Sequence, residues 1–403
     1  MSAPVSVTGI GLVTPAGIGT AANWERLRAA RPAAATDSEL EGLPVTFSCR
    51  VPEFDPVALL GNRLSWQFDP VVQFALVAAR EAIADAGLDA TTWESARVGV
   101  VIGSCVGGAR TGAEQSEKLR RAGPGAVSAM FLPMYLVNMV AGVIAMQFKA
   151  TGPNLVVSTA CASGSTAIGV GRELLNSGQC DIVIAGGSEA ATTPLFVSGF
   201  ARMRALSTRN EDPAAASRPF AADRDGFVMA EAAGILVLER PADAEARGAR
   251  RWASVVGYGN SADGYHVTSP HPQGAGARAA ARMACADAGV APDEVRHVNA
   301  HGSATRLNDA IEAQYIKDFF PSALTTSTKG VTGHALGAAG AIEAAFTALT
   351  LHHQLVPATA NLERQDPDVG IEIATVTTPA AIELAASNSF GFGGHNAVLL
   401  MAK

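Results

Sequence analysis

Short runs of β-branched and other apolar residues alternate along the chain with longer stretches rich in alanine. Glycine and polar residues bound the short runs, as they bound buried strands, whereas the alanine-rich stretches are long enough for helices. This alternation is typical of an α/β protein with buried sheets. The pattern predicts strands over Val5–Gly9, Val98–Ile102, Leu155–Ser158, Ile182–Ala185, Gly234–Leu238, Ala253–Tyr258, Val295–Asn299, Ile373–Val376 and Ala397–Met401. It predicts helices over Asp69–Ala86, Ala162–Ser177, Gly276–Ala288, Ala310–Phe319 and Gly340–His352.

The two halves of the chain contain similar segments in the same order. SVTGIG near the start has a counterpart in SVVGYG from residue 254, and VGVVIGSCVGG (98–108) corresponds to VRHVNAHGSAT (295–305). VVSTACASGS from residue 156 corresponds to TTSTKGVTGHALG from residue 325, and GILVLERP corresponds to NAVLLMAK at the end. Chance similarity between α/β segments is the alternative. We predict a duplicated unit, residues 1–249 and 250–403, in which each half supplies one sheet.

The composition narrows the class of protein. The 403 residues are 48% hydrophobic and 17% charged, which excludes disordered and small disulfide-rich proteins. A net charge of -7 argues against non-specific binding to nucleic acid. Five scattered cysteines without a C-x-x-C pair indicate a reducing compartment, and no signal peptide or membrane-spanning stretch is visible. We expect a cytoplasmic protein in which residues 130–148 form a buried helix.

Cys161 lies in STACASGS, between a predicted strand and an Ala- and Gly-rich helix. A thiol at such a turn is close to the positive end of the helix dipole and to unpaired N–H groups, which lower its pKa. Small neighbours such as Ala160 and Gly164 would let a substrate approach closely. A buried structural cysteine is an equally good interpretation of Cys161 alone. Cys105 in GSCVGG is more typical of a pocket-lining or packing residue.

Two histidines follow predicted strands of the second half. His301, in HGSAT, comes after the strand VRHVNA, and His334 lies in a Gly-rich turn that enters a helix. The His334 turn is the counterpart of the Cys161 turn. If these turns face each other across a pseudo-twofold axis, Cys161, His301 and His334 come together. A lone histidine is more often a core or surface residue, but three such residues at equivalent strand ends predict a shared site.

The chain contains, in this order, the motifs TGIGLVTPAG, GSCVGG, VNMVAG, TACASG, GGSEA, RALSTRN, SRPF, RDGFVMAEAAG, NAHGSAT, STKGVTGHALGAAGAIE and NSFGFGG. Over essentially its whole length it resembles an elongating β-ketoacyl-acyl carrier protein synthase, in the ketosynthase branch of the thiolase fold. The resemblance implies two pseudo-symmetric halves in a five-layered αβαβα sandwich. It also implies an acyltransferase that joins an acyl chain to malonyl-acyl carrier protein by decarboxylative Claisen condensation.

The resemblance assigns roles to the three residues of the shared site. Cys161 matches the acylated nucleophile, and His301 and His334 match the pair that promotes decarboxylation. Two histidines indicate the elongating class, because thiolases use a second cysteine and chain-starting ketosynthases use His with Asn. The intact Cys161 argues against a silent subunit of the chain-length-factor type, which lacks this cysteine.

Further residues match positions that support the reaction in this family. Lys329 is expected to order the site electrostatically, and Phe392 in GFGG matches the gating phenylalanine, whose N–H would help to hold the oxyanion. We expect Asp309 and Glu343 to hold loops and Lys329 in place. No metal is expected, because the histidines lack the spacing and the Cys or Asp companions of a metal site. No bound cofactor is expected, because phosphopantetheine arrives on the carrier protein.

Several positions depart from the family's pattern. HGSATR replaces the usual HGTxTP, so Arg306 stands in place of proline. His395 replaces the common threonine after GFGG and would either pack or bond to phosphopantetheine. Met134 and Tyr135 occupy a segment where small residues are usual, and with Val106 we expect them to shape the acyl pocket. Their bulk favours a specialised acyl substrate.

An acidic enzyme that binds an acidic carrier protein needs a local basic patch. Arg202, Arg204 and Arg209, in and beside RALSTRN, are the first candidates, and Arg63 is the second. A solvated charged surface is the alternative for these arginines. The partner subunit would be an identical chain or a cysteine-less chain-length factor.

We favour a type II polyketide ketosynthase. The alternatives are a housekeeping fatty-acid elongation synthase, a non-elongating decarboxylase-like or scaffolding subunit, and a CoA-dependent thiolase.

Overall fold

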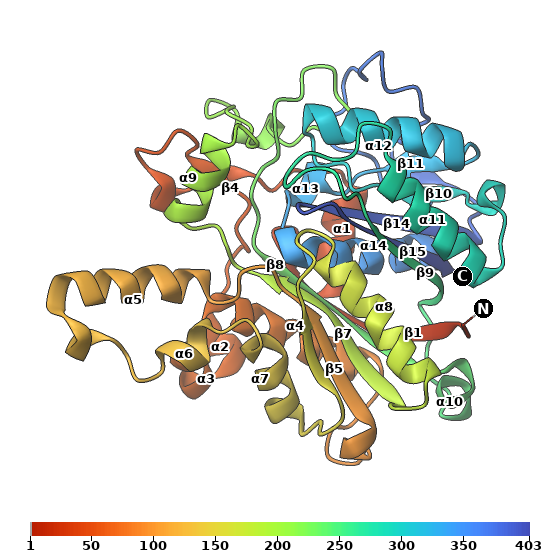
Figure 1. The fold of residues 1–403 in the computed structure, drawn as a ribbon. Helices are drawn as coiled ribbons and strands as arrows, with labels where there is room; N and C mark the ends of the chain where they lie inside the picture. The colour runs from red at the N-terminus through yellow and green to blue at the C-terminus, as the bar shows by residue number, and fades with distance from the viewer. Residues whose placement is uncertain (1) are drawn as a thin grey trace.

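A computed structural model describes residues 2–403 (Figure 1). Eleven of the described strands form one sheet in the order β11-β10-β14-β15-β9-β1-β8-β7-β5-β6, in which β2 (Gly17–Ile18) pairs with β1. Two small sheets pair β3 (Ala35–Thr36) with β4 (Phe47–Ser48) and β12 (Leu355–Val356) with β13 (Thr378–Pro379). The longer strands of the large sheet before residue 250 are β1 (Val5–Thr14), β5 (Val98–Gly103), β6 (Asn154–Val157), β7 (Ile182–Glu189) and β8 (Ala232–Glu239). Those after it are β9 (Ala253–Ala262), β10 (His297–Asn299), β11 (Leu324–Thr326), β14 (Leu384–Gly391) and β15 (His395–Ala402).

The two ends of this sheet have the same strand order and sense. In the series β1-β8-β7-β5-β6 the first two pairings are antiparallel and the last two are parallel. The series β9-β15-β14-β10-β11 repeats this arrangement. β1 and β9 join the two series through a short antiparallel contact that pairs Val5 with Val255. The halves therefore share one hydrogen-bonded sheet, whereas the sequence predicted two separate sheets.

Helices α8 (Ser163–Asn176) and α14 (Ala339–His353) lie between the two halves of the sheet. α8 contacts β5 and β7 on one side and β9 and β15 on the other, and α14 contacts both β8 and β14. Helices α4 (Pro70–Asp85) and α7 (Met139–Phe148) cover the first half, and α11 (Ala275–Ala288) covers the second, with α12 (Arg306–Phe319) beside it (Figure 1). The five-layered αβαβα sandwich of the thiolase fold is confirmed.

Paired glycines let one helix lie directly on a strand in each half. A Cβ atom at Gly9 or Gly11 of β1 would be 2.0 or 1.9 Å from a carbonyl oxygen of α4. A Cβ atom at Gly257 or Gly259 of β9 would be 2.4 or 2.0 Å from a carbonyl oxygen of α11. The Gly-x-Gly pattern that begins each half therefore seats an alanine-rich helix in the same way.

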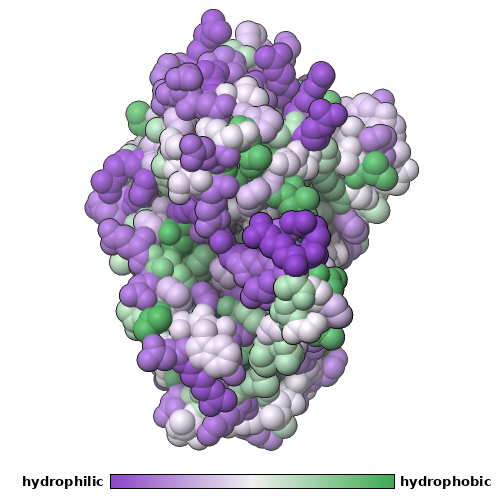
Figure 2. All heavy atoms as spheres, turned by 90° about the vertical axis from the view of Figure 1, so that its left-hand side faces the viewer, coloured by the Kyte–Doolittle hydropathy of each residue, from purple (hydrophilic) through white to green (hydrophobic). Residues whose placement is uncertain are grey.

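The remaining α-helices surround this framework. They are α1 (Thr20–Arg28), α2 (Pro56–Leu60), α3 (Asn62–Gln67), α5 (Ala109–Ala122), α6 (Phe131–Tyr135), α9 (Pro194–Arg202), α10 (Pro241–Ala246) and α13 (Lys329–Thr332). Helix α5 projects farthest from the sheet on the left in Figure 1, and Figure 2 views this face, where strongly hydrophilic residues near the centre border apolar patches. Within residues 2–403, no helix combines the length and the apolarity needed to cross a membrane.

Two predicted elements differ from the structure. Residues 130–148 form the separate helices α6 and α7 instead of one buried helix, and Leu132 and Met146 are 54% and 64% exposed. The chain turns between them where the Met134 carbonyl lies against the backbone of Gly108. Residues 373–376 form no strand, because only Ile373 is bridged to β11, whose one strand partner among the described residues is β10.

Candidate active site

The turn that carries Cys161 lies between β6 and α8. Ala160 has a left-handed backbone with a φ of 49°. The hydroxyl of Ser163 accepts a hydrogen bond from the Thr159 N–H at 2.9 Å and donates one to the Ala160 carbonyl at 2.6 Å. A Cβ atom at Gly164 would be 2.5 Å from a backbone nitrogen of α14. This close approach of α8 to α14 brings the Cys161 turn next to the second half of the chain.

The position before α8 does not activate the Cys161 thiol. Burial raises the pKa of Cys161 to about 12, and the smaller effects of the Lys329 ammonium and the Phe392 N–H act in the opposite direction. The prediction of a lowered Cys161 pKa is wrong in its net direction, because desolvation of the sulfur outweighs the favourable charges. Burial of the sulfur therefore favours the protonated thiol over the thiolate.

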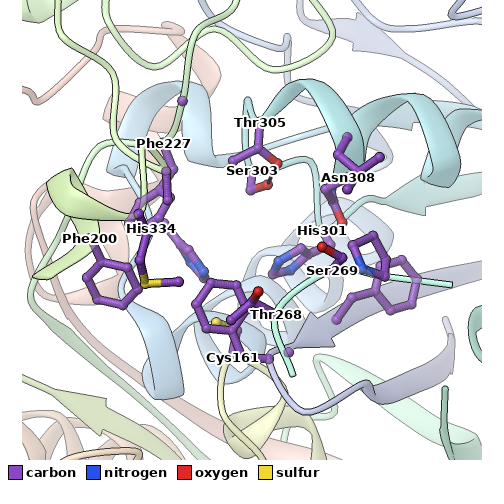
Figure 3. A pocket seen from close by; sticks show the side chains of 18 of the residues that line it. Cys161, Phe200, Phe227, Thr268, Ser269, His301, Ser303, Thr305, Asn308 and His334 are labelled. Carbon is purple, nitrogen blue, oxygen red and sulfur yellow. Dashed lines mark hydrogen bonds between the residues drawn. The ribbon is translucent and has the colours of Figure 1, made fainter. Parts of the chain in front are cut away.

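His301 and His334 line the same cavity as Cys161 (Figure 3). His301 follows β10, and His334 lies between α13 and a short 3-10 turn over residues 336–338. The centroids of the two imidazole rings are 5.2 Å apart, and the ring planes are at 86°. The ring centroids of Phe227 and His334 are 5.2 Å apart, and those of Phe390 and His301 are 5.8 Å apart. Figure 3 shows the two imidazoles approaching from opposite sides, with Cys161 below them.

Both imidazoles are neutral at pH 7. Burial, with a further contribution from the Lys329 ammonium, lowers the pKa of His301 and of His334 well below the usual value. Nδ1 of each ring is buried and has no hydrogen-bond partner within residues 2–403. Nε2 is therefore the nitrogen that can bond to a ligand in the cavity.

Lys329 is buried beneath the histidines. Its Nζ donates to the carbonyl of His301 at 2.6 Å and to the carboxylate of Glu343. Burial raises the pKa of Glu343 to about 7, against the stabilising effect of Lys329 on the carboxylate. The pair fixes the His301 backbone and places a positive charge close to both imidazoles.

A carboxylate that the sequence analysis missed also holds His301. Glu312 accepts hydrogen bonds from the N–H groups of His301 and Gly302, both at 2.8 Å. Asp309, one helical turn earlier on α12, instead accepts from the Phe220 N–H at 2.8 Å and makes no contact with Lys329. α12 begins at residue 306 and not at the predicted 310, and this start places both carboxylates in its first two turns. Their i,i+3 spacing is the signal that could have identified Glu312.

The cavity has a volume of about 400 Å³. Phe392 lines the cavity, and its ring centroid is 6.1 Å from that of Phe200. The other lining residues include four with hydroxyl groups and two arginines, which are Thr268, Ser269, Ser303, Thr305, Arg204 and Arg306 (Figure 3). Within residues 2–403, no three His, Cys, Asp or Glu side chains are grouped so that they could hold a metal ion.

Four predicted pocket residues do not line this cavity. Val106 donates its N–H to Glu189 at 3.3 Å, and His395 pairs with β9 and β14 at the start of β15. The backbone of Met134 lies against α5, and the Tyr135 ring covers Gly112 of that helix and is 40% exposed. Of these four residues, Met134 and Tyr135 are on α6, which packs the Tyr135 ring on α5 and not toward the cavity. A role in the acyl pocket stays a prediction for all four residues.

The predicted docking arginines differ in their surroundings. Arg204 lines the cavity, and Arg202 is exposed at the end of α9. Arg209 forms an ion pair with Asp223 at 2.9 Å, so its charge is neutralised. Arg63 is exposed on α3, in the lower part of Figure 1, whereas α9 lies in the upper part. The four arginines therefore form no single patch.

Two family models match the chain. The N-terminal domain of β-ketoacyl synthases matches residues 2–244, and the C-terminal domain matches residues 252–363. Together with the fold and the Cys-His-His cavity, these matches show that the chain belongs to the β-ketoacyl synthase family, whose members are acyltransferases.

Individual relatives and structures agree with this family. The 3-oxoacyl-[acyl-carrier-protein] synthase 2 of Synechocystis sp. is 41% identical over 406 residues, which cover 99% of this chain and 98% of the relative. The ishigamide ketosynthase/chain length factor has a TM-score of 0.94 and 32% identity, with full coverage of both chains. The ketosynthase in the complex AntDE:AntF has a TM-score of 0.90 and 31% identity, with coverage of 100% and 99%.

Proposed function

We propose that this protein catalyses the decarboxylative condensation of an acyl chain, held on Cys161, with malonyl-acyl carrier protein. The observation that carries the proposal is the convergence of one thiol and two neutral imidazoles on a single cavity of about 400 Å³. A thiol supplies the nucleophile for acyl transfer, and two neutral N–H donors supply the site for a developing enolate oxygen.

In the first half-reaction the Cys161 sulfur attacks the thioester carbonyl of the acyl carrier. The resting thiol is protonated, since its pKa is about 12, so attack and loss of its proton are coupled. The C–S bond to phosphopantetheine breaks, and the departing sulfur takes up one proton. The backbone N–H groups of Cys161 and Phe392 hold the oxyanion of the tetrahedral intermediate.

In the second half-reaction a malonyl carrier enters the cavity. Nε2–H groups of His301 and His334 bond to the malonyl thioester oxygen and stabilise the enolate that forms as CO2 leaves. The enolate carbon attacks the acyl-Cys161 carbonyl, the C–S bond to Cys161 breaks, and the thiolate takes a proton from solvent. The products are CO2 and a carrier-bound β-ketoacyl chain.

The cavity also accommodates the phosphopantetheine arm that delivers each substrate. Ser303 and Thr305 on one side, with Thr268 and Ser269 on the other, offer hydroxyl groups to its amides (Figure 3). The carrier docks at Arg204, beside the cavity, and at nearby Arg202. A related ketosynthase is described in complex with a type II PKS acyl-carrier protein, which supports a carrier partner here.

We place the reaction in a type II polyketide pathway. The similarity to the ishigamide ketosynthase/chain length factor over the whole chain supports this setting and a partner subunit that is a second copy or a chain-length factor. The second candidate is housekeeping fatty-acid elongation, which is favoured by the higher identity to the 3-oxoacyl-[acyl-carrier-protein] synthase 2 of Synechocystis sp.. Competition between saturated and unsaturated acyl carriers separates the two, because a polyketide enzyme is expected to prefer the unsaturated chains.

Intact-mass spectrometry tests the reaction itself. Incubation with an acyl carrier should add one acyl group to the wild-type chain and none to the Cys161→Ala variant. Addition of malonyl carrier should remove that group and yield a carrier-bound β-ketoacyl product. Acylation without elongation would support the non-elongating alternative, and absence of acylation would refute the proposed mechanism.

A further inference from the structure

His334 is held by a short backbone segment, residues 228–231, which runs beside it. The His334 N–H donates to the Val228 carbonyl at 2.8 Å, and the His334 carbonyl accepts from the Ala230 N–H at 3.1 Å. Phe227, which precedes the segment, packs against the imidazole. A Cβ atom at Gly333 would be 3.0 Å from the Val228 carbonyl oxygen. The position of segment 228–231 therefore sets the position of His334.

The outer edge of the same segment is held by residues 49–51. The Cys49 N–H donates to the Met229 carbonyl at 2.8 Å, and the Glu231 N–H donates to the Cys49 carbonyl at 3.2 Å. The Val51 N–H donates to the Glu231 carboxylate at 3.3 Å. Residues 49–51, segment 228–231 and His334 therefore lie side by side as three backbone segments linked by hydrogen bonds, with bridges between Cys49 and Ala230 and between Met229 and His334.

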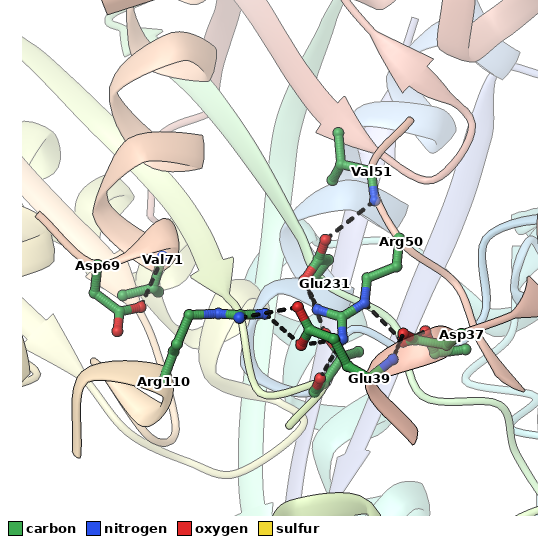
Figure 4. Close-up of polar contacts among 10 residues, drawn as sticks. Asp37, Glu39, Arg50, Val51, Asp69, Val71, Arg110 and Glu231 are labelled. Atoms are coloured by element: carbon green, nitrogen blue, oxygen red, sulfur yellow. Dashed lines mark hydrogen bonds and ion pairs between the residues drawn. The ribbon is translucent and has the colours of Figure 1, made fainter. Parts of the chain in front are cut away.

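The guanidinium of Arg50 hydrogen-bonds residues 49–51 to the surrounding segments (Figure 4). Its Nε donates to Asp37 at 2.8 Å, Nη1 donates to Glu231 at 3.0 Å, and Nη2 donates to Glu39 at 3.0 Å and to the Thr192 carbonyl at 2.7 Å. Three segments, which contain residues 37–39, Thr192 and Glu231, thus meet at one side chain. Only a planar guanidinium presents donors in the directions that these acceptors need, so lysine is no equivalent.

The other catalytic histidine is held by different groups. Lys329 and Glu312 fix the backbone of His301, and neither contacts Arg50. A displacement of segment 228–231 would therefore move His334 while the contacts of His301 and the turn of Cys161 remain.

We propose that Arg50 is a positioning residue for His334 and acts through Glu231 and segment 228–231. The inference rests on the proposed function, in which His334 serves decarboxylation but not the acylation of Cys161. Loss of the Arg50 contacts should therefore separate the two half-reactions.

The test compares Arg50→Met with the matched control Arg97→Met in the full-length protein. Arg97 also makes four hydrogen bonds, two to Asp181 and two to the carbonyls of Gly178 and Gln179, outside the cavity. Two rates are measured for each variant: single-turnover acylation of Cys161 by an acyl carrier, and release of CO2 from malonyl carrier.

We expect Arg50→Met to slow CO2 release by about 10- to 100-fold, as small displacements of a catalytic group do. Acylation should stay within about twofold of the wild type, and Arg97→Met should change neither rate. Arg50→Lys should restore only part of the lost rate, because it can replace some of the four hydrogen bonds.

Epistasis supplies the second readout. In a His334→Ala background, Arg50→Met should cause no further loss of CO2 release, because both changes act through one residue. An equal loss of acylation and CO2 release, or a further loss in that background, would refute the positioning role.

If Arg50→Met fails to fold, Glu231→Gln is measured with the same two rates, since it keeps a side chain that can bond to Thr192 and Val51. A wild-type protein that releases no CO2 would instead refute the proposed function.

Discussion

The strands β6 and β11 occupy equivalent places in the two halves and lead to Cys161 and toward His334, but their outer edges differ. The Thr325 N–H of β11 donates to the Glu372 carbonyl at 2.9 Å, and its carbonyl accepts from Ala374 at 2.9 Å. Within residues 2–403, β6 pairs only with β5, and Leu155 is 43% exposed. Because a free strand edge can pair with another chain, the nucleophile half is open to a partner whereas the histidine half is closed by its own chain.

The two turns that follow these strands also differ in exposure to solvent. Every residue from Lys329 to Ala339 is buried, whereas residues 159–161 are partly exposed. A nucleophile has to be reached by the substrate that acylates it. The histidines act through the exact placement of two N–H donors, and a buried network of carboxylates, a lysine and backbone groups provides that placement.

The largest effect on stability is expected at the base of the buried turn. Lys329→Met leaves the Glu343 carboxylate buried without its partner, and should lower the free energy of unfolding by about 3–5 kcal/mol. The double variant Lys329→Met/Glu343→Leu should recover much of this loss, because no charge is then left unpaired. Denaturant titration measures both variants. Equal stability of single and double variants would contradict this account of the pair.

Removal of the His334 imidazole and removal of the Cys161 thiol should affect different half-reactions. His334→Ala should lower condensation by about 10²–10³-fold, the usual cost of one oxyanion donor, while Cys161 is still acylated. Cys161→Ala should abolish acylation. Intact-mass measurements and CO2 release distinguish these outcomes. Loss of acylation in His334→Ala would show that acylation also depends on the histidine half of the chain.

A lysine introduced at the edge of β6 should affect association, whereas a lysine introduced at the edge of β11 should affect stability. Leu155→Lys on the open edge of β6 should weaken association with a partner and change the stability of the folded chain by only about 0.5 kcal/mol. Thr325→Lys buries a charge in the covered edge of β11 and should destabilise the fold by several kcal/mol. Light scattering and thermal unfolding measure the two effects. An unchanged mass for Leu155→Lys would argue against pairing through β6.

The last expected effect is a change in the pH dependence of stability, which leaves both half-reactions and both strand edges in place. Burial raises the pKa of Glu312 from 4.5 to about 7, so between these values the folded state binds more protons than the unfolded state. Glu312 therefore makes stability fall as pH rises through this window, by at most about 1.4 kcal/mol per pH unit. Glu312→Gln should flatten this slope in unfolding titrations from pH 4.5 to 7, and an unchanged slope would assign the dependence to other groups.

Much of the fold was predictable because its signals are local. The alternation of apolar runs and alanine-rich stretches predicted most strands and helices, and the repeated segments pointed to the duplication that the strand order displays. The misplaced strand at 373–376 and the missed β14 show the limit of this signal. A short apolar run becomes a strand only where it pairs with a neighbouring strand over several residues, and that neighbour is distant in sequence.

Candidate chemistry was predictable where residue type and motif suffice, as for Cys161, His301 and His334. The protonation of Cys161 and the role of Glu312 were not predictable, because both depend on burial and on contacts between distant segments. The placement of Met134 and Tyr135 away from the cavity also depends on how α6 turns against α5.

The sequence by itself determined the α/β class, the family and the residue types that the reaction needs, because motifs and periodicity are properties of neighbouring residues. Only the tertiary structure decided which groups hold the two histidines, which strand edge stays open and how desolvation shifts each pKa. These properties arise from distances between segments far apart in the chain, which no local pattern specifies.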